Sequence, residues 1–216
     1  MRSPPLRLSD PPGIGYNARV KESQPSSLAG RFLIAEPELT DPNFSKTVVL
    51  LTHHSENGAF GLVVNRRTEL QLGGAVPRLA DHAIASQPMY LGGPVQQEYL
   101  FVLHSGLDGR RSDNSIEVSP GLVFEPDFTL IEDYLRTEWE KLAGENRPEL
   151  RFMAGYSGWG GGQLEGELEH KAWTWIEAEA GVVFQRKSEE IWKEALRRKG
   201  GIYWALAETG YKPSLN

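Results

Sequence analysis

The sequence predicts one domain of the mixed α+β class. Short runs rich in β-branched and aromatic residues, joined by tight turns, fill the chain up to Pro126, which is typical of locally paired strands. Apolar residues recur at helical spacing only after that point. The chain shows neither an internal repeat nor the regular alternation of strands and helices that a parallel sheet requires. Its 216 residues are close to the roughly 100–200 residues of one domain.

The first strands are predicted by apolar runs and by the turns between them. Residues 31–35 form a short apolar run that ends before Pro37, and the β-branched run 46–52 predicts a buried strand after the turn signal at 41–43. Residues 53–58 end in Asn57-Gly58, a strong hairpin signal, so we expect 59–65 to be the returning strand.

Two more strands and the first helix follow. Residues 98–104 predict a strand after the glycine-containing turn 91–95, and another strand ends at Phe124 beyond a charged surface loop at 110–114. Pro126 and Gly144 then bound a helix, as proline often does at helix starts and glycine at helix ends. Its apolar positions recur every three or four residues: Phe128, Ile131, Leu135, Trp139 and Leu142.

The last third predicts strand, glycine corner, helix, strands and helix. Residues 150–155 are expected to form a strand and 155–162 a glycine-rich corner. Leu164, Leu168 and Ala172 indicate a second helix, and 173–176 and 182–184 indicate closing strands. A third helix is capped by Ser188, with acidic residues in its first turn and the basic run 197–199 in its last. We therefore expect about three helices.

Composition excludes several function classes. The chain has no cysteine, which excludes disulfides, thiolate nucleophiles and cysteine-ligated metals. No stretch approaches 18 consecutive apolar residues, so no membrane span is predicted. With 23 Lys and Arg against 29 Asp and Glu, the net charge of −6 argues against direct DNA binding.

The N-terminus differs in composition from the rest of the chain. Residues 1–27 contain five prolines and no apolar run that would serve in a secretion signal. We expect this segment to be a flexible tail on a cytoplasmic protein, and 28–216 to be the folded domain.

Five stretches resemble the YqgE/AlgH family of bacterial proteins of unassigned molecular function: residues 30–44, 57–65, 91–95, 103–105 and 155–164. The resemblance covers roughly residues 28 to 200. It implies a mixed, mostly antiparallel sheet bent into a partial barrel, and a cytosolic location. Some members carry a transcriptional-regulator label, but the family supplies no established catalytic residue. A cysteine often found near the end of the second strand is replaced here by Thr52-His53-His54.

The glycine corner is the stretch that most suggests a binding site. A strand, a glycine turn and a helix N-terminus together present N–H groups that bind anions. Three known motifs fail here, however. A P-loop needs Lys and Ser or Thr where Gly161 and Gly162 stand, a dinucleotide fingerprint needs glycine at Gln163, and a nucleophile elbow needs glycine at Trp159. The alternative is a tight turn in which Trp159 packs into the core.

Other constellations are weaker. Ser157 and His104 would imitate a catalytic pair, with Asp108 or Asp113 as a third member, but no spacing selects them. His53 and His54 are adjacent on a strand and point to opposite faces, so we predict no metal site and no cofactor. Gly92 and Gly93 either bring N–H groups to a ligand or form a turn that needs positive φ.

These observations favour a non-catalytic regulatory or binding protein with a small anionic ligand or a protein partner. The alternative is an enzyme that acts on a small phosphorylated or acyl substrate at the glycine corner. The candidate ligand-binding residues stand at predicted strand ends and turns, where folds often carry their sites, and we expect those segments to converge on one face of the sheet. They are Asn65, Gly92, Gly93, His104, Tyr156, Ser157, Trp159 and Gly160.

Overall fold

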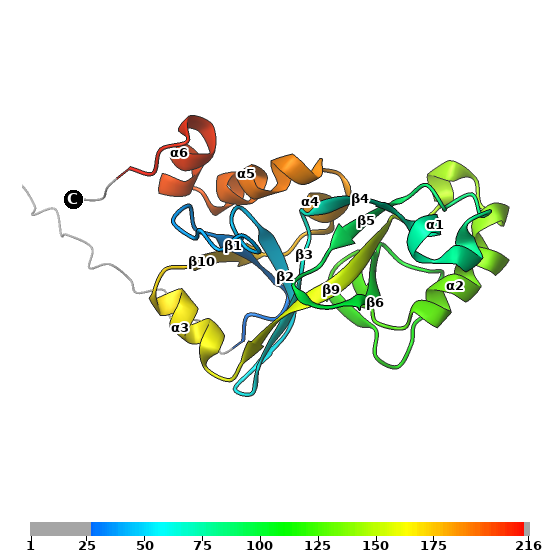
Figure 1. The fold of residues 1–216 in the computed structure, drawn as a ribbon. Helices are drawn as coiled ribbons and strands as arrows, with labels where there is room; N and C mark the ends of the chain where they lie inside the picture. The colour runs from blue at the N-terminus through cyan, green and yellow to red at the C-terminus, as the bar shows by residue number, and fades with distance from the viewer. Residues whose placement is uncertain (1–26, 214–216) are drawn as a thin grey trace, which may run out of the picture.

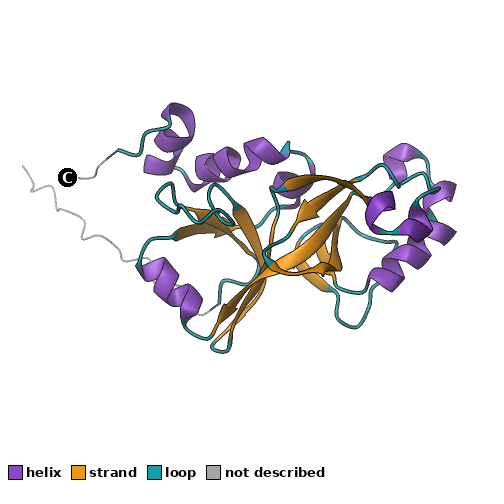
Figure 2. Cartoon of the chain, in the orientation of Figure 1, coloured by secondary structure: helices purple, strands orange, loops and turns teal. Residues whose placement is uncertain are grey.

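The computed structural model describes residues 27–213. The tail predicted for residues 1–27 therefore lies outside the described residues, except for Ser27. A strongly twisted sheet runs through the middle of the molecule, and helices lie along its upper side, at its lower left and at its right-hand end (Figure 1), joined by loops (Figure 2). No helix within residues 27–213 is long and apolar enough to cross a membrane.

Ten strands form the sheet. They are β1 (Arg31–Ala35), β2 (Val48–Ser55), β3 (Gly58–Val63), β4 (Arg67–Gln71), β5 (Pro88–Leu91), β6 (Val95–His104), β7 (Ile116–Ser119), β8 (Leu122–Glu125), β9 (Leu150–Gly160) and β10 (Trp173–Glu177).

Helices flank the sheet. The α-helices are α1 (Leu72–Ala75), α2 (Phe128–Thr137), α3 (Gln163–Glu169), α4 (Ala180–Phe184), α5 (Ser188–Lys199) and α6 (Ile202–Thr209). Three 3₁₀ helices cover Pro77–Leu79, Trp139–Lys141 and Gly144–Asn146.

Strand β9 organises the sheet. The main path runs β10-β1-β2-β3-β9-β6-β8-β7, and β4 pairs with β5, which joins β9. Strand β9 is antiparallel to β3 and β6 and parallel to β5. This mixed, mostly antiparallel sheet bends into a half barrel, as expected.

Both faces of the sheet are covered. On one face, buried residues of α4, α5 and α6 pack against β1, β2, β3 and β9. On the other, α1 and α2 cover β5, β6 and the start of β9, and α3 packs against β1, β2 and β3. These helices together bury both faces of the first half of β9.

Three local predictions are wrong. Residues 182–184, predicted as a strand, lie in the short helix α4, because a run of three apolar residues does not by itself distinguish a strand from a buried helical turn. Residues 155–160, predicted as a corner, continue β9. The predicted helix that reaches Leu142 ends at Thr137 and continues as a 3₁₀ turn. The described part contains six α-helices rather than about three.

Ser27 and Leu28, the first described residues, are held by hydrogen bonds to His54. The Ser27 hydroxyl donates to the His54 carbonyl at 3.0 Å, and the Leu28 N–H donates to His54 Nδ1 at 2.9 Å. The Leu28 side chain is 3% exposed. A deletion that stops before Ser27 therefore spares every one of these contacts, whereas a deletion through Leu28 removes them all.

Deleting residues 1–26 is expected to leave the melting temperature within about 2 °C of the full chain, because the proline-rich, polar composition of this segment offers no apolar run to pack against the core. Deleting residues 1–28 removes a buried leucine worth about 1.5–3 kcal/mol, which lowers the melting temperature by about 5 °C or more. Differential scanning calorimetry on the two truncations measures this. An equal drop in both would show that residues 1–26 themselves contact the domain.

Candidate functional site

Gly92 and Gly93 lie against β9 at backbone contact. The Gly92 N–H donates to the Ala154 carbonyl at 2.8 Å, and the Gly92 carbonyl accepts from the Val63 N–H at 2.7 Å. A Cβ atom at Gly92 would lie 2.3 Å from the Gly155 oxygen, and one at Gly93 2.2 Å from the Tyr156 carbonyl. These glycines are therefore required for close packing of two chain segments, and the space beside them is filled by protein.

Ser157 and His104 do not form a pair. The Ser157 hydroxyl is buried and donates to the Gly92 carbonyl at 3.2 Å. His104 pairs with Leu150, seven residues earlier on β9, which places it roughly 20 Å away along the strand. The predicted convergence therefore holds for Gly92, Gly93, Tyr156 and Ser157, and it is wrong for His104. The hydrolase-like arrangement of Ser157 and His104 is wrong for the same reason.

The other candidates hold the fold together. The Asn65 side chain accepts from the Val48 N–H and donates to the Lys46 carbonyl, both at 2.9 Å. Trp159 donates its indole N–H to Glu167 at 2.9 Å and is buried in the core. The Gly160 N–H donates to the Gln163 side chain at 3.1 Å. One N–H of the expected anion site at the glycine corner is therefore already used within the protein, just before α3 begins.

The two adjacent histidines have separate contacts. His54 Nε2 lies 2.8 Å from the Glu165 carboxylate, whereas His53 packs edge-on against Phe60 with ring centroids 6.3 Å apart. Within the part of the chain that the structure describes, no group of three or more His, Asp or Glu could hold a metal ion.

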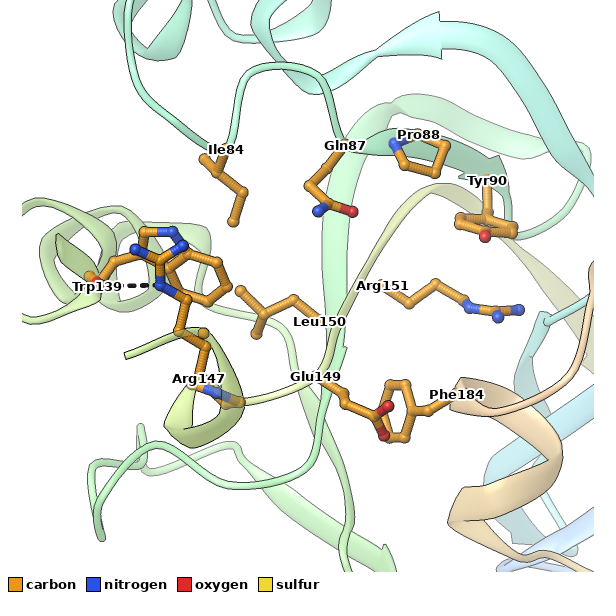
Figure 3. A pocket seen from close by; sticks show the side chains of 12 residues that line it. Ile84, Gln87, Pro88, Tyr90, Trp139, Arg147, Glu149, Leu150, Arg151 and Phe184 are labelled. Carbon is orange, nitrogen blue, oxygen red and sulfur yellow. Dashed lines mark hydrogen bonds between the residues drawn. The ribbon is translucent and has the colours of Figure 1, made fainter. Parts of the chain in front are cut away.

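A cavity of about 440 Å³ opens where β9 begins (Figure 3). Its walls come from the loop before β5, from the 3₁₀ helices after α2, from the start of β9 and from the end of α4. Polar and aromatic side chains line it: Gln87, Tyr90, Trp139, Arg147, Glu149, Arg151 and Phe184. The cavity is large enough for a small metabolite.

Arg151 is the unusual residue of this cavity. It is only 5% exposed, yet among residues 27–213 no carboxylate lies within 4.0 Å of its guanidinium. One nitrogen donates to the Val64 carbonyl, and the guanidinium carbon lies 4.2 Å from the centre of the Tyr90 ring. Burial lowers the pKa of Arg151, and Tyr90 and Glu149 raise it in opposition. An arginine nonetheless keeps its charge at neutral pH.

Such a charge is costly to bury. Removing an ion from water costs several kcal/mol unless a counter-ion and hydrogen bonds replace the lost hydration. A carbonyl oxygen and an aromatic ring offset part of that cost for Arg151, because both present partial negative charge. Glu149 lines the same cavity and raises the pKa of Arg151, but within the described residues no carboxylate forms an ion pair with it, so an anion in the cavity would supply the direct partner.

Arg147 supplies a second cation at the other end of the cavity, next to Trp139 (Figure 3). Its Nε donates to the Trp139 carbonyl at 3.2 Å, and its guanidinium carbon lies 5.0 Å from the centre of the Trp139 ring. Glu149 stands between the two arginines in the sequence and is exposed. Both arginines are thus held in place by an aromatic ring and a backbone carbonyl.

Sequence reasoning missed Arg147 and Arg151. Arg151 lies between Leu150 and Phe152, which fits the alternating apolar and polar residues of an ordinary strand with one polar face. The pattern Arg-x-x-x-Arg around a predicted strand start was the signal available, and it was not specific.

Comparison with known proteins agrees with this fold. A family model described as AlgH-like matches residues 32–204. The chain is 40% identical over 186 residues to a UPF0301 protein of Paraburkholderia phytofirmans, covering 83% of this chain and 92% of that one. A UPF0301 protein of Chlorobaculum tepidum is 34% identical over 187 residues, covering 87% and 95%.

Solved structures show the same architecture. The solution structure of the AlgH protein from Pseudomonas aeruginosa is 32% identical, covers 90% of this chain and 100% of that chain, and has a TM-score of 0.66. A crystal structure of protein DIP2367 from Corynebacterium diphtheriae, 24% identical with a TM-score of 0.66 and covering 86% of this chain and 93% of that one, is similar in fold alone.

Proposed function

The chain belongs to the AlgH-like family, and from that premise we propose that it is a non-catalytic binding protein for a small molecule with an anionic group. The single observation that carries the proposal is Arg151, a buried cation that lines a cavity without a carboxylate partner among the described residues. The anionic group would lie against Arg151, and Arg147 would contact a second polar part of the ligand.

The geometry favours binding over catalysis. The cavity places two cations and aromatic rings around the ligand, which serves recognition of charge and shape. The alternative enzymatic hypothesis uses Ser157 as the nucleophile. The Ser157 hydroxyl donates its hydrogen bond to the Gly92 carbonyl and lies outside this cavity. Arginine suits such a site because its planar group donates two parallel hydrogen bonds to a carboxylate or phosphate.

Arg151→Gln is expected to weaken anion binding by tenfold to a hundredfold, since a hydrogen bond to a charged group is worth about 1.5–3 kcal/mol. Isothermal titration calorimetry with inorganic phosphate, glucose 6-phosphate and citrate measures the affinity. Arg147→Gln is expected to weaken the larger ligands more than phosphate.

The matched control is Arg136→Gln, which removes an exposed arginine of α2 that pairs with Glu132 and does not line the cavity. Its affinities are expected to equal those of the parent chain. Equal loss in Arg136→Gln and Arg151→Gln would mean that the effect is general electrostatics, and the proposal would fail. Arg151→Gln also changes a buried position and so affects packing. Arg147→Gln changes a half-buried residue and therefore gives a second, independent test of anion binding.

A further inference from the structure

A second cavity of about 560 Å³ lies over the sheet at β3, β6 and β8. Its base consists of Phe60, Phe101 and Phe124, whose ring centroids are each 5.7 Å from the other two. Tyr156 stacks on Phe60 at 4.7 Å and supports it from β9. We call these four side chains the aromatic floor. Such a surface binds a flat ring by stacking and edge contacts.

The rim above this floor is polar. Ser112 and Ser115 close a tight turn, in which the Ser115 N–H donates to the Ser112 carbonyl at 3.1 Å. Asp113 and Asn114 are the two central residues of that turn, and both line the cavity. Within residues 27–213, neither of these two side chains has a hydrogen-bond or ion-pair partner in the protein. Their polar atoms are thus available to a ligand.

A buried carboxylate fixes this rim. Glu125 is fully buried and accepts from the Ser112 hydroxyl at 2.6 Å, the Ser112 N–H at 3.2 Å, the Asp127 N–H at 2.9 Å and the Ser115 hydroxyl. Burial alone would raise the pKa of Glu125, but these hydrogen bonds lower it below its ordinary value. Burying the charged Glu125 carboxylate costs free energy, and its hydrogen bonds to the Ser112–Ser115 turn offset part of that cost. The consequence here is that the turn carrying Asp113 and Asn114 is held at both of its ends, Ser112 and Ser115.

We infer that this cavity binds a purine base, guanine in particular. The purine would stack on the aromatic floor, a contact worth about 1–3 kcal/mol per base. The Asp113 carboxylate would accept the two adjacent N–H donors on the guanine edge, which adenine and the pyrimidines do not present in that arrangement. The net charge of −6 favours a free nucleoside over a polynucleotide. The inference is independent of the anion site at Arg151, whose cavity has no residue in common with this one.

The test uses guanosine, which carries no phosphate and so does not engage Arg151 through charge. Isothermal titration calorimetry on the full chain is expected to show guanosine binding at least tenfold tighter than adenosine or uridine. Asp113→Asn is expected to abolish that preference, and Phe101→Leu, which keeps an apolar side chain but removes the ring, is expected to weaken all nucleosides.

Two controls separate the outcomes. Asp81→Asn changes an exposed aspartate that does not line the cavity, and it is expected to leave guanosine affinity unchanged. Arg151→Gln is also expected to leave it unchanged, so loss of anion binding and loss of guanosine binding are distinguishable. Absence of guanosine binding at millimolar concentration, or an unchanged guanosine preference in Asp113→Asn, would overturn the inference.

Discussion

Gly93→Ala is expected to leave most of the protein unfolded or to cost about 3 kcal/mol or more. A Cβ atom there would lie 2.2 Å from the carbonyl carbon and oxygen of Tyr156 and 2.5 Å from the Ser157 nitrogen. All three are backbone atoms in the middle of β9, so no side-chain rotation relieves the overlap. Forcing extra atoms into a packed interior usually costs about 1–3 kcal/mol, and more where the backbone must move. That is a large share of a total stability of about 5–15 kcal/mol.

Urea unfolding followed by far-ultraviolet circular dichroism measures this, and Gly166→Ala is the matched control. Gly166 lies within α3, and a Cβ atom there meets nothing within 4 Å. Alanine is therefore expected to stabilise the protein at that position by up to about 1 kcal/mol. If Gly93→Ala unfolded at the same urea midpoint as the parent protein, the contact between Gly93 and β9 would be loose. The Gly93 N–H would then again be a candidate for ligand contact.

The local part of the fold was predictable because short-range rules decide it. The hairpin of β2 and β3 follows from Asn57-Gly58, although Gly58 opens β3 and the turn itself is formed by Glu56 and Asn57. The stripe of Phe128, Ile131 and Leu135 predicted α2. These segments have one covered face, so their periodicity records burial directly.

The candidate site was harder to predict because it depends on contacts between distant segments. For Leu91-Gly-Gly-Pro-Val95 the sequence leaves open a ligand contact or a turn that needs positive φ, whereas in the structure the two glycines allow the close approach of β9, about 60 residues away in the sequence. Arg151 gives no such signal in the sequence, because alternation does not show that α4 covers one face of β9 while α2 covers the other. Burial of a charge is a tertiary property, and no local pattern encodes it.

His104→Leu is expected to remove about 2 kcal/mol of pH dependence between pH 7.5 and pH 5. His104 is fully buried, and neither ring nitrogen has a hydrogen-bond partner in the described part of the chain. Its pKa is lowered from 6.5 to about 4; burial is the largest cause, Glu125 opposes the shift and Arg111 adds to it. The ring is therefore neutral in the folded state at pH 5, whereas most unfolded molecules carry a proton there.

The sign follows from proton uptake. The unfolded state binds a proton below pH 6.5 that the folded state does not bind until about pH 4. The contribution of His104 to the free energy of unfolding is therefore fully present above about pH 6.5 and decreases as the pH falls from 6.5 to about 4. Urea unfolding of the parent and of His104→Leu at both pH values isolates this contribution, because all other titrating groups are shared. His104→Leu should equal or exceed the parent at pH 7.5, since it removes two unpartnered polar atoms. If both proteins lost the same stability between the two pH values, His104 would have to be hydrogen-bonded or hydrated in solution, and its burial would not govern the acid sensitivity of the fold.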